Sequence, residues 1–173
     1  MRRSACERSV SLCCGNYVLP LPLTILGVDF TSAPSRRKQI TVAVASLQGP
    51  YLRFARIDRL TDFGAFEMML EAPGPWVAGF DFPFGLPREL ALALGWPTSW
   101  TELVKHVRKI GKPAFVGALD QLRQSRPYGA RYIARRGDAA AGSSSPMKLV
   151  NPPVGLMFLE GAPRLLQAGL SIL

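Results

Sequence analysis

Two apolar runs that each carry one aspartate near the end constrain this chain more than any other feature. Residues 25–32 read Ile-Leu-Gly-Val-Asp-Phe-Thr-Ser and contain Asp29, and residues 76–85 read Trp-Val-Ala-Gly-Phe-Asp-Phe-Pro-Phe-Gly and contain Asp81. Both runs are strand-like, and a carboxylate in such a run is costly to bury unless it is paired, protonated or bound to metal. Two neighbouring strands of this kind can hold a pair of carboxylates, which are preferred ligands of hard divalent cations.

Each aspartate also has a simpler interpretation when it is taken alone. Thr31, Ser32 and Pro34 follow Asp29 and favour a turn that its side chain can cap. Asp81 can support a tight turn at the Phe-Pro-Phe-Gly segment that follows it. The elements expected between the two acids favour the paired interpretation.

The segment between the acids predicts three strands, a helix and a fourth strand. Residues 39–45 carry β-branched side chains at alternate positions, and residues 51–57 form a further strand-like run after a Gly-Pro turn. The short connections indicate an antiparallel meander. Thr61 or Asp62 can cap a helix whose apolar positions fall three and seven residues after Phe63. A helical crossover lets the fourth strand run parallel to the first, which would bring the two aspartates together.

Glu67 is the candidate third acid, because it lies one helical turn from Phe63 and can point towards Asp29 and Asp81. Glu71 lies further round the helix and is the weaker candidate, and a solvated acid is the plain alternative for Glu67. Three converging acids would repel each other without a cation. With two Mg²⁺ or Mn²⁺ ions about 3.5 to 4 Å apart, the cluster would activate water and stabilise the leaving oxygen of a phosphodiester. We therefore expect catalytic roles for all three acids and metal ligation by the two aspartates.

Four motifs carry a resemblance to a known family. They read GVDFTSAP at residues 27–34, GFDFPFGLP at 79–87, SSSPMKLVNPPVG at 143–155 and EGAPRLL at 160–166. Together they resemble the domain of unknown function 429 family, a set of predicted nucleases, over about residues 23–169. The resemblance implies an RNase H-like α/β fold, in which a three-stranded antiparallel meander and a parallel fourth strand are packed against helices. It also implies metal-dependent cleavage of nucleic acid.

The resemblance has one departure. RNase H-like domains usually continue with a fifth strand and a C-terminal helix that brings another metal-binding acid, whereas no acid follows Glu160. We therefore expect residues 23–173 to form an incomplete domain that can be inactive, with its fourth strand left as an unprotected edge. Residues 1–22 combine arginines, three cysteines and a Pro-broken apolar stretch, and we expect a loosely ordered extension rather than a cleaved signal peptide.

The formal charge of +9 is concentrated in one third of the chain. Residues 94–148 contain ten Lys or Arg and only three acids. Ser99 and Glu102 predict a capping box for one helix, and a second helix is expected from Pro113 to about Gln124. The loop that follows interleaves tyrosines with arginines, a pattern that suits a nucleic acid backbone with splayed bases. The expected nucleic-acid-binding residues are Arg126, Tyr128, Arg131, Tyr132, Arg135, Arg136 and Lys148. The alternative is a solvated basic surface whose tyrosines pack on the core.

Other chemistries have little support in the sequence. No run approaches the roughly 20 apolar residues of a membrane span, and the cysteine spacing fits neither a disulfide framework nor a zinc site. We therefore expect a cytoplasmic protein without a membrane partner. His106, the only histidine, is expected on the polar side of its helix, which disfavours Ser-His or Cys-His catalysis. No Gly-rich phosphate loop with a following Lys is present.

Three functions remain open at this point. The first is a divalent-metal-dependent nuclease. The second is a nucleic-acid-binding module without turnover, in which the acid set is incomplete. The third is an actin-like or sugar-kinase-like phosphotransferase, which also places an acid at the end of a first strand but requires a second domain.

Overall fold

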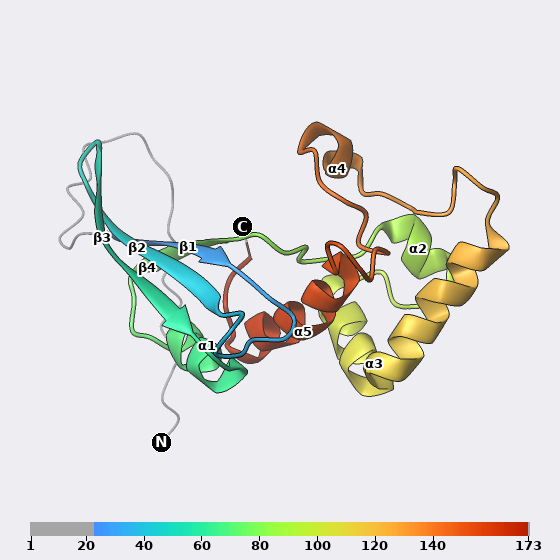
Figure 1. Ribbon diagram of the computed structural model, residues 1–173, viewed down its shortest axis with the longest axis horizontal. Coiled ribbons are helices and arrows are strands. Elements are labelled where there is room, and N and C mark those ends of the chain that lie inside the picture. The colour runs from blue at the N-terminus through green and yellow to red at the C-terminus, as the bar shows by residue number, and fades with distance from the viewer. Residues whose placement is uncertain (1–22, 173) are drawn as a thin grey trace, which may run out of the picture.

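The computed structural model describes residues 23–172, which form a four-stranded sheet followed by a helical region (Figure 1). The expected extension at residues 1–22 lies outside the described residues. In chain order the elements are β1 (Leu23–Asp29), β2 (Ile40–Gln48), β3 (Tyr51–Leu60), α1 (Phe63–Leu70), β4 (Trp76–Phe80), α2 (Arg88–Ala93), α3 (Trp100–Ser125), α4 (Arg136–Ala140) and α5 (Val154–Gln167).

The sheet has the strand order β3-β2-β1-β4. The β1–β2 and β2–β3 pairs are antiparallel, and β4 lies parallel to β1, as the short turns and the helical crossover predict. In the β1–β4 register, Gly27 lies opposite Gly79 and Val28 lies opposite Phe80. The expected α/β fold with a meander and a parallel fourth strand is therefore confirmed, and the carboxyl ends of β1 and β4 lie at the same end of the sheet.

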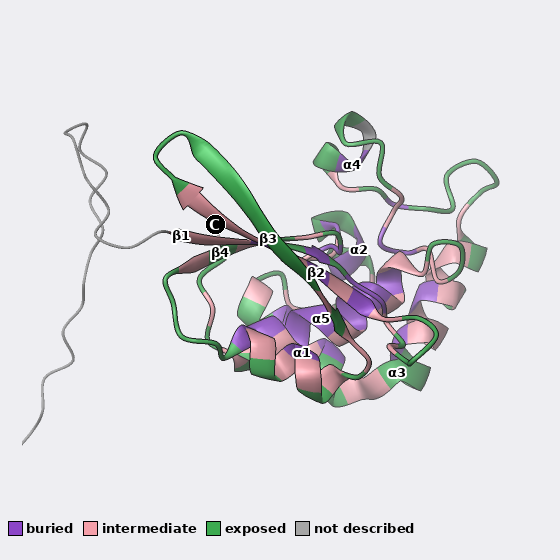
Figure 2. Cartoon of the chain, turned by 60° about the vertical axis from the view of Figure 1, so that its left-hand side comes forward, coloured by how far each residue is buried: buried purple, intermediate pink, exposed green. Residues whose placement is uncertain are grey.

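One face of the sheet forms the first core. Alternate residues of β1 and β2, among them Val28 and Val42, pack in one cluster with Phe66 of α1 and Leu165 of α5. Figure 2 shows α1 and α5 together on one side of the sheet. Because side chains of a strand alternate between its faces, the neighbours of these buried residues lie on the opposite face. Asp29 is one of them and is exposed. The sheet thus has a packed face and a face that presents Asp29.

Helix α5 joins this core to a second core made with α2 and α3. Phe158 and Ala162 of α5 are fully buried in the second core, whereas Leu165 belongs to the first. Gly161 is required at the crossing, because a Cβ atom there would lie 2.5 Å from the ring of Phe82. The segment that follows Asp81 is therefore clamped against α5.

The helices refine two sequence predictions. Asp62, not Thr61, caps α1, since its carboxylate accepts a hydrogen bond of 2.9 Å from the backbone N–H of Ala65. Helix α3 is broken at Gly111, which has φ of 73°, so the expected pair of helices is present within one long element. The predicted capping box is wrong: the Ser99 side chain makes no capping bond, and Glu102 pairs with Lys105 at 3.0 Å.

No helix within residues 23–172 has the length and apolar character that crossing a membrane requires.

Candidate acidic site at the ends of β1 and β4

Asp29 and Asp81 lie next to each other where β1 and β4 end. The backbone N–H of Asp81 donates to the carbonyl of Val28 at 3.2 Å, which continues the parallel pairing by one residue beyond Phe80. The Oδ1 atom of Asp81 accepts a hydrogen bond of 2.8 Å from the backbone N–H of Phe30. The structure therefore brings together the two aspartates that the strand order predicts as neighbours.

The charges of the two aspartates are not compensated within the described residues. Partial burial raises the pKa of the Asp81 carboxyl, and although the Phe30 N–H lowers it, the charge of Asp29 and a hydrogen bond to the Asp29 side chain raise it further. None of the ion pairs among residues 23–172 involves either acid. Two adjacent carboxylates without a basic partner favour the uptake of a proton or a cation.

The strand surface next to the acids carries two glycines. Gly27 and Gly79 face each other in adjacent strands, and both are exposed. A Cβ atom at Gly79 would meet nothing within 4 Å, and one at Gly27 would meet only the Cβ of Ala43 at 3.9 Å. Glycine in a strand interior commonly marks the close approach of a ligand or another backbone. The signal for this pair in the sequence is a Gly two residues before each aspartate, and the sequence predictions do not include it.

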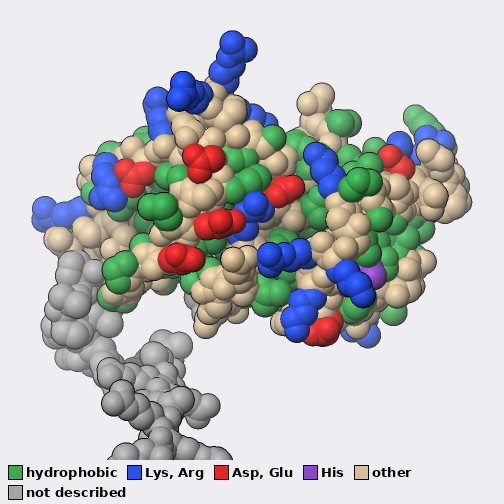
Figure 3. All heavy atoms as spheres, turned by 90° about the horizontal axis from the view of Figure 1, so that it is seen from below, with side chains coloured by type: hydrophobic (Ala, Val, Ile, Leu, Met, Phe, Trp, Pro, Cys, Tyr) green, Lys and Arg blue, Asp and Glu red, His purple; other side chains and the backbone are tan. Residues whose placement is uncertain are grey.

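Glu67 does not join the two aspartates. Its Oε1 lies 3.0 Å from Nε of Arg164, whose guanidinium also binds Glu160 at 2.9 Å and lies 3.6 Å above the ring of Phe63. We call Glu67, Glu160 and Arg164 the arginine cluster. Acidic and basic side chains adjoin across the face seen from below in Figure 3. Within residues 23–172, no group of three or more His, Cys, Asp or Glu side chains could hold a metal ion.

The tyrosines of the basic loop do not pack on the core. Tyr128 is 91 % exposed and Tyr132 is 49 % exposed, and the guanidinium of Arg131 lies 5.4 Å from the centre of the Tyr128 ring. This arrangement argues against the plain alternative of core-packed tyrosines. The aromatic surfaces remain accessible for stacking.

Two of the expected basic residues are held by acids. Arg126 pairs with Glu89 at 3.2 Å, and Arg135 pairs with the buried Asp138 at 2.6 Å. Burial acts to raise the pKa of Asp138, but hydrogen bonds from Arg135 and Ser143 and the charge of Arg135 together lower it. Arg131, Arg136 and Lys148 take part in none of the ion pairs of the described residues. Fewer basic side chains are therefore available to a ligand than the sequence pattern predicts.

The environment of His106 differs from the expected one. Its ring packs against Trp96, with ring centres 5.3 Å apart, and its Nε2 atom is buried without a hydrogen-bond partner in the described part of the chain. The expectation of a polar helix side is therefore wrong, because the loop after α2 places Trp96 over that side. No nucleophile or acid adjoins His106 among the interactions of residues 23–172, so a role in catalysis gains no support.

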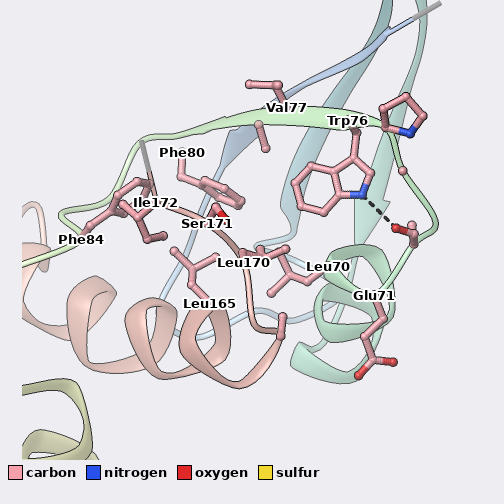
Figure 4. Close-up of a pocket in the computed structure, with 15 residues that line it drawn as sticks. Leu70, Glu71, Trp76, Val77, Phe80, Phe84, Leu165, Leu170, Ser171 and Ile172 are labelled. Atoms are coloured by element: carbon pink, nitrogen blue, oxygen red, sulfur yellow. Dashed lines mark hydrogen bonds between the residues drawn. The ribbon is translucent and has the colours of Figure 1, made fainter. Parts of the chain in front are cut away.

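A large pocket lies beside β4, between that strand, the end of α1 and the residues after α5 (Figure 4). It has a volume of about 700 Å³ and mostly apolar walls that include Trp76, Phe80 and Leu165. The carboxylate of Glu71 points away from it (Figure 4). The pocket lies on the packed side of the sheet, and its walls within residues 23–172 do not hold a cluster of polar groups that could carry out a reaction. We therefore take the acid pair, not this pocket, as the candidate site.

In comparisons with known proteins, no family model, curated protein or solved structure matches the chain. A fold does not by itself identify a function, since many unrelated functions share folds. The function is therefore inferred from the acid pair and from the basic loop.

Proposed function

We propose that this chain is a divalent-metal-dependent nuclease of RNase H-like architecture that hydrolyses phosphodiester bonds. The observation that carries the proposal is the adjacent, uncompensated pair Asp29 and Asp81 at the carboxyl ends of two parallel strands. Two of the four motifs that resemble the domain of unknown function 429 family contain these acids, which supports the same proposal.

The acid pair fits a Mg²⁺ or Mn²⁺ ion. Magnesium in phosphate-processing sites is commonly held by one or two carboxylates together with substrate phosphates, and two carboxylates are what this site offers. One oxygen of Asp81 is already fixed by the N–H of Phe30, which leaves its other oxygen and the Asp29 carboxylate for an ion. A bound ion would supply an activated water and stabilise the leaving oxygen of the phosphodiester.

The remaining residues would bind and orient the substrate. The Phe30 N–H holds the Asp81 carboxylate in place, and Gly27 and Gly79 leave room for a nucleic acid strand to approach the acids. Arg131 and Arg136 offer positive charge to phosphates, and the exposed tyrosines of the basic loop offer rings on which bases can stack.

A nucleic-acid-binding module without turnover is the second candidate. The position of Glu67 favours it, because its pairing with Arg164 leaves only two acids at the site among the described residues. Such a module would keep the binding surface and lack hydrolysis.

The proposal is tested by incubating the full chain with labelled single-stranded DNA, single-stranded RNA and an RNA–DNA hybrid, with Mg²⁺, with Mn²⁺ or with chelator. We expect metal-dependent cleavage that is lost in Asp29→Asn and in Asp81→Asn. Calorimetric titration with Mn²⁺ supplies a second readout, and we expect both variants to bind the ion about tenfold or more weakly.

Asp58→Asn is the matched control, since it removes an acid from the same sheet that is paired only with the exposed Arg56. It should leave both cleavage and Mn²⁺ binding unchanged. Cleavage that persists in both site variants would reject the assignment. Nucleic acid binding without cleavage under any metal condition would favour the binding module.

A further inference from the structure

We propose that the small pocket formed by Tyr132, Ser144, Ser145 and Lys148 is a binding site for the phosphate group of a nucleotide. It has a volume of about 280 Å³ and lies between the loop that follows α3 and the loop that leads to α5. We call it the Lys148 pocket. The nucleotide character of the ligand rests on the proposed function, whereas the preference for a phosphate rests on the pocket itself.

The walls of the Lys148 pocket are fixed by hydrogen bonds between its two loops. The Ser145 hydroxyl donates to the carbonyl of Ile133 and accepts from the N–H of Met147 at 3.1 Å. The Ile133 N–H donates to the sulfur of Met147 at 3.2 Å, and both of these residues are buried. The bonds between Ser145 and Ile133 and between Ile133 and Met147 join the two loops, so they set the positions of the pocket walls relative to each other.

The backbone of Lys148 is held on both sides. Its N–H donates to the carbonyl of Ser145 at 2.9 Å, and its carbonyl accepts from the N–H of Gly155 at 2.8 Å. Gly155 belongs to the first turn of α5, and a Cβ atom there would lie 2.6 Å from the carbonyl oxygen of Pro146. The close contact between this turn and α5 therefore fixes where the lysine side chain begins.

Asp138 of α4 fixes the start of the loop that runs from α4 to Lys148. Its carboxylate accepts hydrogen bonds from the Arg135 backbone at 2.6 Å and from the Ser143 hydroxyl at 3.1 Å. The Ser143 N–H donates to the Asp138 carbonyl at 2.8 Å. Because the Asp138 carboxylate is already paired with Arg135 and Ser143, it does not offset the charge of Lys148.

The residues that line the pocket carry polar groups that suit an oxyanion. The four lining residues provide one ammonium and three hydroxyl groups, and no carboxylate. Lys148 is half-buried and takes part in no ion pair of the described residues. The Ser145 hydroxyl is occupied, which leaves Lys148, Ser144 and Tyr132 as the donors for a ligand. An ammonium group repels a cation, and hydrogen bonds from charged donors to a phosphate are stronger than those between neutral groups.

Tyr132 could contact the base or sugar of a nucleotide whose phosphate lies in the pocket. Tyr132 lines the pocket and is 49 % exposed, so one side chain can offer both a hydroxyl for the phosphate and a surface for a base or sugar. Stacking of a base on an aromatic ring tolerates every base. The Lys148 pocket would thus anchor one nucleotide of a strand without reading its sequence.

The test measures binding in the presence of chelator, so that no hydrolysis is required. Thymidine 5′-monophosphate, thymidine and inorganic phosphate are titrated against the full chain by calorimetry. We expect the monophosphate to bind and thymidine not to bind, and Lys148→Met to weaken the monophosphate about tenfold or more. Tyr132→Phe should cost less than Tyr132→Ala, since only the second variant removes the ring.

Lys109→Met is the matched control, because Lys109 is an exposed lysine of α3 that takes part in no ion pair of the described residues. Ser144→Ala provides a second pocket variant should Lys148→Met fold poorly, and it should weaken the monophosphate by a smaller factor. Equal binding of inorganic phosphate and the monophosphate, with the same loss in Lys148→Met, would support the phosphate site and assign it to free phosphate. Equal affinities of the Lys148→Met and Lys109→Met variants, or equal binding of thymidine and its monophosphate, would overturn the inference.

The outcomes separate this inference from the proposed function. Phosphate binding through Lys148 in a chain that cleaves no substrate would keep the Lys148 pocket and reject the nuclease. Cleavage that depends on Asp81, together with monophosphate binding that does not depend on Lys148, would keep the nuclease and reject the pocket.

Discussion

The acid pair and the arginine cluster use the same kind of side chain to opposite effect. In the cluster, Glu67 and Glu160 share the guanidinium of Arg164, which also lies over the ring of Phe63. In the pair, no ion pair of the described residues offsets the charge of Asp29 or Asp81, and partial burial together with the charge of Asp29 raises the pKa of Asp81. A cluster in which one arginine offsets part of the charge of two acids joins two elements, whereas two acids without a basic partner repel each other until a cation binds.

This contrast assigns different tasks to the two groups. The arginine cluster connects α1 to α5 and therefore contributes to stability. The two like charges of the acid pair do not stabilise the fold. Such arrangements are typical of functional sites, where activity is kept at the expense of stability. Substitutions in the acid pair should therefore lower activity without lowering stability. Substitutions in the arginine cluster should lower stability.

The largest effect is expected for the acid pair. Asp81→Asn should lower metal-dependent cleavage at least roughly 100-fold, because it removes a ligand charge from the site. Its free energy of unfolding should be equal to or higher than that of the unsubstituted chain, since the amide oxygen can still accept from Phe30. Cleavage rates and urea denaturation of the same preparation check both parts. Equal cleavage by Asp81→Asn and the unsubstituted chain, or a similar loss in Glu67→Gln, would erase the contrast between the groups.

The next effect concerns stability alone. Arg164→Met should lower the free energy of unfolding by about 2 kcal/mol, since it leaves two acids without their partner and removes the cation over Phe63. Urea denaturation measures this loss, and binding of Mn²⁺ should be unchanged. Arg56→Met is the control, because its pair with Asp58 is exposed and should contribute much less. An equal loss in the two variants would contradict the role given to the cluster.

The acid pair could be predicted from the sequence because strand order and register determine it. An apolar run identified β1, alternating β-branched residues identified β2, and the helical crossover placed β4 beside β1, so the positions of Asp29 and Asp81 followed. Glu67 could not be placed in this way. Its partner Arg164 lies in α5, far away in the sequence, and no local pattern reveals that this arginine reaches α1.

Helix α5 itself was not predicted, because residues that usually interrupt helices occur within it. Gly155, Gly161 and Pro163 weaken any expectation of a 14-residue helix. The structure explains the glycines by packing, since a Cβ at Gly155 would meet the Pro146 carbonyl and one at Gly161 would meet the Phe82 ring. Tertiary contacts therefore outweigh local propensity here, and they also create the surroundings of Lys148 that the sequence does not show.

A smaller effect should appear in the pH dependence of stability. The pKa of Asp81 is raised in the folded chain, so between its ordinary value and the raised value the folded state binds more protons than the unfolded state. The stability of the unsubstituted chain should therefore fall as pH rises through this window, relative to Asp81→Asn. The difference should be absent below the ordinary carboxyl pKa and stay under about 1 kcal/mol above the window, because solvent screens exposed charges. Urea denaturation across acidic pH checks this, and a difference of opposite sign would contradict the raised pKa of Asp81.

The smallest expected effect tests how a substrate reaches the acid pair. Gly79 is exposed and a side chain there would meet no atom within 4 Å, so Gly79→Leu should fold with little loss of stability. The added side chain would lie beside the acids on the strand surface proposed for the substrate, and KM should rise about threefold with kcat nearly unchanged. Gly117→Leu in α3, where a Cβ would also meet nothing, is the control for the substitution itself. Since the arginine cluster lies among packed helices and the acid pair on an open strand surface, only the pair should be sensitive to such a change. Equal KM values for the two variants would mean that a substrate does not cross Gly79.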